Sequence, residues 1–172
     1  MPREADNSSP ALAQAVLKSD RLFLCAGEMG TGAARLWRDA TGALRAIAPP
    51  ADVRPDWLWL DIWTGDQRVG AAGLLFQDDG PMEIGFRIEP EHRRRGYATE
   101  ATRLLIALAF GALGESEIAA DAAEDNLASH RTLLRLGFGD VGSGGQRWSE
   151  RRGTYINYRR YRLVRTVEGQ GS

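Results

Sequence analysis

Cysteine and lysine are almost absent from this sequence. The single cysteine, Cys25, excludes an internal disulfide and any cysteine-based metal cage, and this usage fits a reducing compartment. Lys18 is the one lysine among 22 basic residues, so arginine carries nearly all of the positive charge. Abundant Ala and Gly favour codon usage in a GC-rich genome as the general explanation, but a guanidinium also binds phosphate and carboxylate well. The positions at which the arginines cluster decide between codon usage and anion binding as the explanation.

The chain also lacks a net charge, a long apolar run and a hydrophobic leader. Its 22 basic and 23 acidic residues give a net charge of -1, so no whole-molecule field attracts nucleic acid or an anionic membrane. No uninterrupted apolar run of about 18 residues could span a membrane. Residues 1–10 are polar and do not resemble a secretory signal. We therefore expect a cytoplasmic protein that binds neither nucleic acid nor membranes.

What is present is typical of one globular domain. The chain has 172 residues, of which 43% are hydrophobic and 26% charged, enough for one sizeable core and too few for two. Residues 1–10 and 166–172 are rich in Ser, Gly and charge and show no periodicity. We expect disordered tails on either side of a single domain at 11–165.

Hydrophobic patterning predicts an α+β fold with a mixed sheet. The expected strands are residues 17–26, 57–64, 69–76, 82–88, 118–123 and 154–164. The expected helices are about fifteen residues from Tyr97 and residues 126–136. Residues 27–55 suggest short helices interrupted by glycine and closed by Pro49-Pro50, and residues 142–145 suggest a glycine-rich loop.

A basic loop joins the strand at 82–88 to the long helix. Its run Arg93-Arg94-Arg95-Gly96-Tyr97-Ala98 lies where a helix exposes unpaired backbone N–H groups, a place suited to phosphate or pyrophosphate. Gly96 lets the backbone approach the anion, and small Ala98 leaves the first turn uncrowded. A solvated basic turn that only caps the helix would show the same residues. The Walker pattern and the dinucleotide fingerprint are absent, which argues against a nucleoside triphosphatase or a dehydrogenase.

Three motifs in this chain resemble those of a known enzyme superfamily. Arg93-x-x-Gly96-x-Ala98 matches the Arg/Gln-x-x-Gly-x-Gly/Ala signature of the GNAT acetyltransferases, and Glu83-Ile84-Gly85-Phe86 resembles their fourth strand. Asn126-x-x-Ser129 followed by Leu136-Gly137-Phe138 is similar to the RimJ/RimL branch, which acetylates ribosomal-protein N-termini. The resemblance is strong over about residues 59–138, and the order and spacing of the three motifs make it specific.

The resemblance implies a GNAT-like mixed central β-sheet with helices on both faces and acetyl-CoA in a V-shaped gap between strands 4 and 5. By the same resemblance, backbone groups on the fourth strand pair with the pantetheine amides, the loop cradles the pyrophosphate, and the start of the second helix touches the pantetheine arm and the sulfur. The implied cofactor-binding residues are Phe86, Ile88, Arg93, Arg94, Arg95, Gly96, Tyr97, Ala98, Thr99, Asn126 and Ser129.

Acyl transfer to an amine requires a neutral amine, so a general base is expected directly or through water. Glu83 is the first candidate because it matches an acidic position on the fourth strand of the superfamily; the alternative is an exposed residue beside the turn at Pro81. Asp61 is the second candidate, since Trp59, Asp61 and Trp63 share one face of an extended strand, where burial raises a carboxyl pKa. The alternative for Asp61 is core packing with backbone donors.

Many relatives stabilise the departing thiolate with a tyrosine, but Leu133 occupies that position here. The resemblance offers the hydroxyl of Ser129 instead; its alternative role is helix capping together with Asn126. His92 and His130 have no partner spacing typical of a metal site, so we expect no metal.

The sequence therefore predicts an acetyl-CoA dependent N-acetyltransferase that acts by direct attack in a ternary complex. The sequence does not decide whether the acceptor is a protein N-terminus or a small amine. The rival hypothesis is a catalytically silent acyl-CoA binding or sensing domain. An RNA-binding role for the arginines of residues 159–165 is weak, because they alternate between the faces of a strand. The tryptophan-rich strand and the final strand are candidate surfaces for a homodimer.

Overall fold

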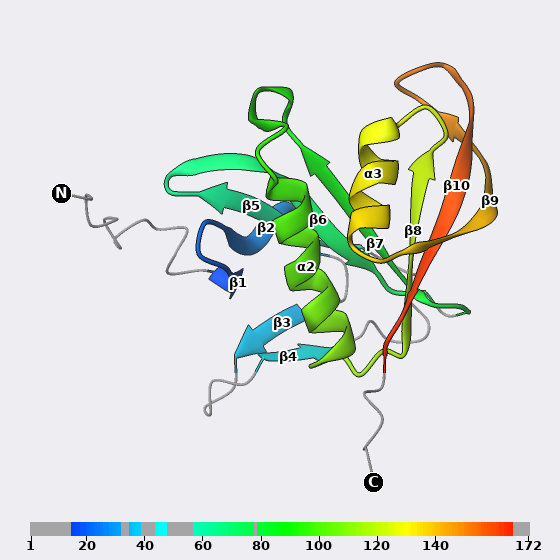
Figure 1. Ribbon diagram of the computed structural model, residues 1–172. Coiled ribbons are helices and arrows are strands. Elements are labelled where there is room, and N and C mark those ends of the chain that lie inside the picture. The colour runs from blue at the N-terminus through cyan, green and yellow to red at the C-terminus, as the bar shows by residue number, and fades with distance from the viewer. Residues whose placement is uncertain (1–14, 32–34, 39–43, 48–56, 78, 167–172) are drawn as a thin grey trace, which may run out of the picture.

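The computed structural model describes residues 15–31, 35–38, 44–47, 57–77 and 79–166 (Figure 1). The strands are β1 (Ala15–Lys18), β2 (Phe23–Thr31), β3 (Arg35–Arg38), β4 (Leu44–Ile47), β5 (Trp57–Thr64), β6 (Gln67–Leu75), β7 (Met82–Ile88), β8 (Glu117–Ala123), β9 (Gly139–Ser149) and β10 (Thr154–Val164). The helices are the short 3-10 helix η1 (Pro90–His92), α2 (Tyr97–Phe110) and α3 (Leu127–Arg135). No helix among these residues is long and apolar enough to cross a membrane.

The large sheet is mixed, with the strand order β1-β2-β5-β6-β7-β8-β10-β9. Its neighbouring strands pair antiparallel except β7 and β8, which are parallel. The β7–β8 ladder holds at Met82 with Ile118 and at Glu83 with Ala119, although β7 continues to Ile88. The two strands therefore part after their first residues, and the sheet opens there.

Both α-helices of the described part pack on the same face of this sheet (Figure 1). Ile84 of β7 and Leu105 of α2 belong to one hydrophobic core. Tyr161 of β10 is the register partner of Ala120, and its hydroxyl lies 2.6 Å from Nδ1 of His130 on α3. The prediction of helices on both faces is therefore wrong for the residues that the structure describes. The opposite face carries alternate residues of the same strands.

Strands replace two features that the sequence suggested. The single strand expected at 17–26 is divided into β1 and β2, because Ser19 N donates to Leu22 O and Leu22 N donates to Ser19 Oγ, which closes a turn. Where residues 27–55 are described, they form the end of β2 and the antiparallel pair β3–β4 rather than helices. Their few apolar residues do not distinguish a period of about 2 from one of about 3.6.

The glycine-rich loop expected at 142–145 is instead part of strand β9. Gly142 and Gly145 have φ values of 105° and 82°, and the register of β9 against β10 shifts opposite them. Glycine at positive φ is typical of β-bulges, so the glycines bend a strand instead of ending it.

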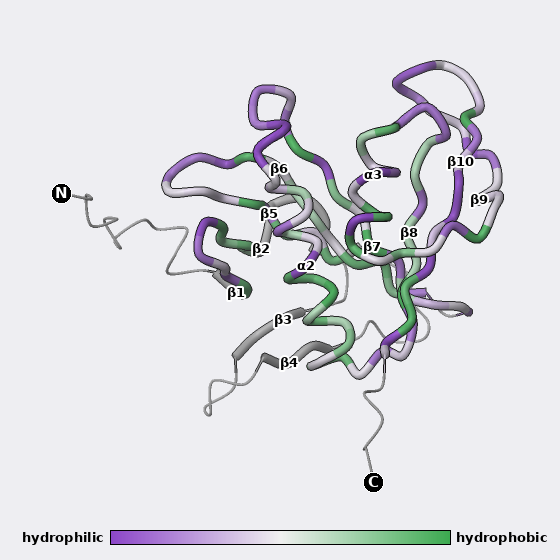
Figure 2. Tube along the Cα trace, viewed as in Figure 1, coloured by the Kyte–Doolittle hydropathy of each residue, from purple (hydrophilic) through white to green (hydrophobic). Residues whose placement is uncertain are grey.

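The other elements agree with the sequence expectations to within about two residues. The expected strands correspond to β5 to β8 and β10, and the expected helices to α2 and α3. Most of α2 is hydrophobic, whereas the loop before it and much of β10 are hydrophilic (Figure 2). The tails predicted at 1–10 and 166–172 lie outside the described residues, apart from Thr166.

Candidate functional site

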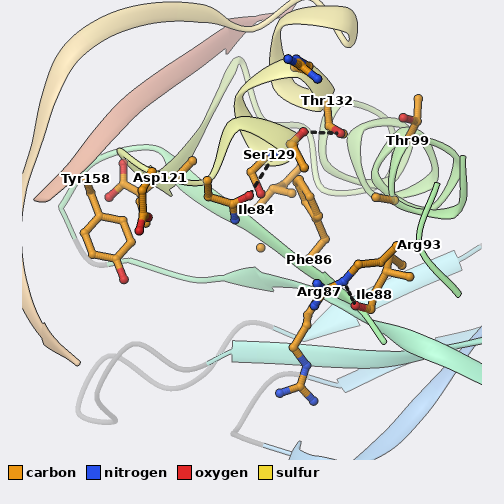
Figure 3. Close-up of a pocket in the computed structure, with 18 of the residues that line it drawn as sticks. Ile84, Phe86, Arg87, Ile88, Arg93, Thr99, Asp121, Ser129, Thr132 and Tyr158 are labelled. Carbon is orange, nitrogen blue, oxygen red and sulfur yellow. Dashed lines mark hydrogen bonds between the residues drawn. The ribbon is translucent and has the colours of Figure 1, made fainter. Parts of the chain in front are cut away.

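A cleft of about 1200 Å³ occupies the opening between β7 and β8. Its walls come from β7, the loop before α2, the starts of α2 and α3, and the β9–β10 hairpin, and Figure 3 shows several of these residues. The cleft brings together most of the residues predicted from the sequence: Glu83, Phe86, Ile88, Arg93, Arg94, Gly96, Tyr97, Ala98, Thr99, Asn126 and Ser129. Arg95 and Asp61 are not among its lining residues.

The edge of β7 that faces the cleft is set by its pairing with β6. Glu89 N donates to Val69 O of β6. Backbone groups of successive residues in a strand point to opposite edges, so Phe86 and Ile88 direct theirs toward the cleft. The carbonyl of Ile88 already accepts a hydrogen bond from Arg93 Nε at 3.0 Å (Figure 3). The groups of Phe86 and the N–H of Ile88 are thus the ones left to pair with a ligand.

The loop before α2 adopts two left-handed backbone conformations. Gly96, the residue before the first helical residue, has φ 80°, and Arg94 has φ 62°. The backbone of a non-glycine residue is strained in this conformation, and strained residues of this kind are concentrated at binding sites. Glu100 N bonds to Gly96 O, so the backbone N–H groups of Tyr97, Ala98 and Thr99 start the helix without acceptors in the preceding turn. The arrangement is suited to an anion.

The turn between β1 and β2 holds this loop from outside. Arg21 Nη1 donates to Arg95 O at 3.2 Å, and Arg21 Nε donates to Glu100 Oε2 at 2.7 Å. Ser19 Oγ donates to the other oxygen of Glu100 at 2.5 Å. Burial raises the pKa of Glu100, but the bonds from Ser19 and Arg21 outweigh it and hold the pKa below its usual range. Glu100 therefore connects the first turn of α2 to the turn between β1 and β2.

The start of α3 forms the opposite wall of the cleft. Asn126 Oδ1 accepts a hydrogen bond from Ser129 N at 3.2 Å, which confirms Asn126 as the cap of the helix. Ser129 is half-buried and lines the cleft. Its backbone serves the cap, and its hydroxyl is a separate group available for another contact.

Glu83 is buried on the wall of the cleft, with 7% of its surface exposed. The alternative of an exposed residue beside Pro81 is therefore wrong. Its Oε1 accepts a hydrogen bond from Arg160 Nη2 at 2.5 Å. A carboxylate in this place can accept a proton from a substrate amine or from a bridging water.

Sequence reasoning missed three charged residues beside Glu83. Asp121 is 4% exposed at its side chain and pairs with Arg160 and Arg147. Burial raises the pKa of Asp121, but the hydrogen bonds from both guanidinium groups outweigh it, so its pKa lies below the usual range. One signal could have found Asp121, because it is a charge flanked on both sides by alanine in the interior of the strand Glu117–Ala123.

Asp61 lies away from the cleft on β5. Arg68 Nε donates to its Oδ1 at 2.8 Å, and Arg68 Nη1 reaches Glu89 Oε1 at 3.0 Å. Asp61 is thus paired with a side chain of the next strand and not with the backbone donors expected. The structure does not bring this second candidate base to the site.

His130 and the arginines of β10 have structural partners, whereas Nδ1 of His92 is buried without a hydrogen-bond partner among the residues that the structure describes. His130 Nε2 lies 3.1 Å from Glu124 O and its Nδ1 2.6 Å from Tyr161 Oη. In the described part of the chain, no group of three or more His, Cys, Asp or Glu residues could hold a metal ion. Arg159 and Arg162 pair with Asp140 and Glu117, so β10 presents no single basic stripe.

Comparisons with known proteins point to one family. A family model described as an acetyltransferase (GNAT) domain matches residues 15–139. The uncharacterized N-acetyltransferase YoaA of Bacillus subtilis is 43% identical over 72 residues, which cover 41% of this chain and 41% of that protein. The matched stretch thus spans about two-fifths of the length of this curated relative.

Solved structures of the same kind share the fold. Mycobacterium smegmatis RimJ in complex with CoA-disulfide has a TM-score of 0.57 at 22% identity, covering 63% of this chain and 53% of that one. The ribosomal-protein-S5-alanine acetyltransferase of Vibrio fischeri has a TM-score of 0.56 at 16% identity, covering 63% of this chain and 61% of that one. At these identities the likeness concerns the fold, a mixed sheet with this order of elements.

Proposed function

This chain belongs to the GNAT acetyltransferase family, and on that premise we propose that it transfers the acetyl group of acetyl-CoA to a primary amine by direct attack in a ternary complex. The observation that carries the proposal is the cleft where β7 and β8 part, because it gathers eleven lining residues that the family motifs had assigned. The acceptor is a protein N-terminus or a small-molecule amine.

The residues of the cleft suit acetyl-CoA as a co-substrate. Phe86 and the N–H of Ile88 offer backbone groups to the pantetheine amides. The loop from Arg93 to Thr99 offers helix N–H groups and guanidinium charge to the pyrophosphate, with Arg95 at its outer side. A volume of about 1200 Å³ leaves room for an acceptor beside the cofactor.

Two side chains would carry out the proton and charge chemistry. Glu83 accepts the proton of the attacking amine, directly or through a water, so that the nitrogen lone pair can form the new C–N bond. Ser129 donates a hydrogen bond to the thiolate as the C–S bond breaks, at the positive end of α3. The proton taken from the amine neutralises the departing thiolate after transfer.

A thiol-release assay with acetyl-CoA tests the proposal. The amine panel contains peptides beginning with alanine or serine, spermidine, an aminoglycoside and free amino acids. At least one amine should stimulate release, and Glu83→Gln should lower kcat about 100-fold. Ser129→Ala should lower kcat about 10-fold, the worth of one hydrogen bond to a charged group.

Matched controls separate chemistry from folding. Glu117→Gln removes a carboxylate of similar pairing on β8, where Glu117 contacts Arg162, and Ser116→Ala removes an exposed hydroxyl. Both should leave kcat within about two-fold. If acetyl-CoA binds but no amine stimulates thiol release, the sensing-domain alternative replaces this proposal.

The homodimer predicted from the sequence remains a proposal as well. Both β5 and β10 lie between two paired neighbours in the large sheet, so neither offers a free edge. A dimer through these strands would have to use their faces. Sedimentation equilibrium of the full chain tests this, and a monomer at micromolar concentration contradicts it.

A further inference from the structure

Four charged residues, one chosen from each of four adjacent strands, lie on the face of the sheet that α2 and α3 do not cover. In sheet order these are Glu83 on β7, Asp121 on β8, Arg160 on β10 and Arg147 on β9. Asp121 lies two residues beyond Ala119, the register partner of Glu83, and Arg160 is the register partner of Asp121. In sheet order two acidic residues are thus followed by two basic ones, and these four residues are called here the charge row.

The contacts along the charge row run in one chain. Arg160 Nε and Nη2 both bind the Asp121 carboxylate at 2.9 Å, and Nη2 also donates to Glu83 Oε1. Arg147 pairs with Asp121 from the other side, and its guanidinium lies 4.7 Å from the centre of the Tyr158 ring. Asp121 thus orients Arg160, Arg147 orients Asp121, and the ring of Tyr158 packs against Arg147.

Burial makes these contacts decisive for Glu83. The side chains of Asp121 and Glu83 are 4% and 10% exposed, so water cannot orient or solvate them fully. A buried carboxylate needs a partner of opposite charge, and losing one partner costs much more than losing an exposed pair. Arg160 is the group that serves both carboxylates at once.

We propose that Arg160 is a positioning residue for the general base. By bridging Asp121 and Glu83 it holds Oε1 of Glu83 and leaves Oε2 to receive the proton of the acceptor amine. This inference rests on the proposed function and adds to it a residue 77 positions away in the sequence. Arg160 lies outside the loop before α2, so it takes no part in holding the cofactor phosphates.

The test compares Arg160→Met, Arg160→Lys and Glu83→Gln, singly and combined, with the amine of highest turnover in the thiol-release panel. Arg160→Met should lower kcat at least about 10-fold, because a small displacement of a reacting group is costly. The KM for acetyl-CoA should stay within about two-fold, and lysine should restore part of kcat. In the Glu83→Gln background, Arg160→Met should change kcat less than about two-fold.

Arg159→Met is the matched control, because Arg159 directly precedes Arg160 in β10 and its pair with Asp140 lies outside the cleft. It should leave kcat within about two-fold in both backgrounds. Hydroxylamine, an amine that is neutral at neutral pH, needs no base, so with it Arg160→Met should retain nearly the full wild-type rate. Should Arg160→Met fail to fold, Asp121→Asn keeps Arg160 but removes its anchor, and it should show the same loss of kcat.

Each outcome decides the inference. An equal loss of kcat in the wild-type and Glu83→Gln backgrounds, or an equal loss with hydroxylamine, means that Arg160 only supports the fold and overturns the proposal. An Arg160→Met enzyme as active as the wild type also overturns it, while the acetyltransferase activity itself stands. A wild-type protein that turns over no amine overturns both the function and this role.

Discussion

At the residue scale, the loop before α2 depends on two backbone conformations that side chains disfavour. Gly96 has φ 80°, and the one atom that an added Cβ would meet within 4 Å is Arg21 Nη2, at 3.4 Å. Space is therefore available at Gly96, and its conformation is the constraint. Arg94 adopts φ 62° in spite of its side chain. Such a curled backbone points N–H groups toward a common centre, which an anion can occupy.

Gly96→Ala should weaken acetyl-CoA binding. An L-residue in the left-handed region costs about 1–2 kcal/mol, so the loop should relax to another conformation and the dissociation constant should rise about 10-fold. Isothermal titration with acetyl-CoA measures this. Gly114→Ala is the control, because Gly114 has φ 73° in open space after α2. Gly114→Ala should lower the free energy of unfolding by a similar amount without changing the affinity for acetyl-CoA. If Gly96→Ala and Gly114→Ala bind acetyl-CoA equally well, the proposal that the loop binds an anion is contradicted.

At the scale of elements, helix α3 is placed by its cap and by one polar contact with the sheet. Asn126 caps its first turn, and His130 connects it to the hydroxyl of Tyr161 on β10. If Nε2 of His130 donates to Glu124 O, then Nδ1 accepts from Tyr161, so a single tautomer satisfies both bonds. The start of α3 is thereby held against the end of β8, where the cleft needs it.

Asn126→Ala should lower the free energy of unfolding by about 1 kcal/mol, because the N–H of Ser129 loses its acceptor. The frayed first turn should also raise the KM for acetyl-CoA. Asn126→Asp should retain both properties, since a carboxylate caps equally well. Urea denaturation and steady-state kinetics measure the two effects. Asn157→Ala, which removes an exposed amide bonded to Gln146, is the control and should change neither.

At the scale of the whole molecule, ion pairs connect segments far apart in the chain. Glu100 joins α2 to the β1–β2 turn, and Asp121 joins β8 to β9 and β10. Both carboxyl pKa values are lowered in the folded protein. A depressed pKa means that the stabilisation is complete above the pKa of the unfolded chain and is lost as the pH falls through the folded value.

The free energy of unfolding should therefore decrease as the pH is lowered below about 5. Asp121→Asn should be less stable than the wild type at neutral pH and show a shallower decrease, because the ionised group is gone. Urea denaturation at several pH values measures both slopes. Parallel profiles for the two proteins would show that Asp121 does not contribute to the acid sensitivity.

Local sequence features, such as caps and glycines, explain which parts of the fold could be predicted from the sequence. The long helix begins after Gly96 and ends before Gly111, and Asn126 caps the second helix, so their bounds follow from propensity and capping. The split of residues 17–26 depends on a turn closed by Ser19, and the bulges of β9 depend on pairing with β10. Neither is visible in hydrophobic periodicity, because the turn is closed by local hydrogen bonds between Ser19 and Leu22 and the bulges are set by pairing with another strand.

The amino-acid sequence by itself determined the family motifs, the phosphate-suited loop at Arg93 to Ala98 and the candidate base Glu83, since these are contiguous or closely spaced residues. Only the tertiary structure decided that Glu83 is buried beside Arg160, that Asp61 pairs with Arg68 away from the cleft, and that both described α-helices share one face. The physical reason is register: a shift of one residue moves every side chain of a strand to the other face of the sheet.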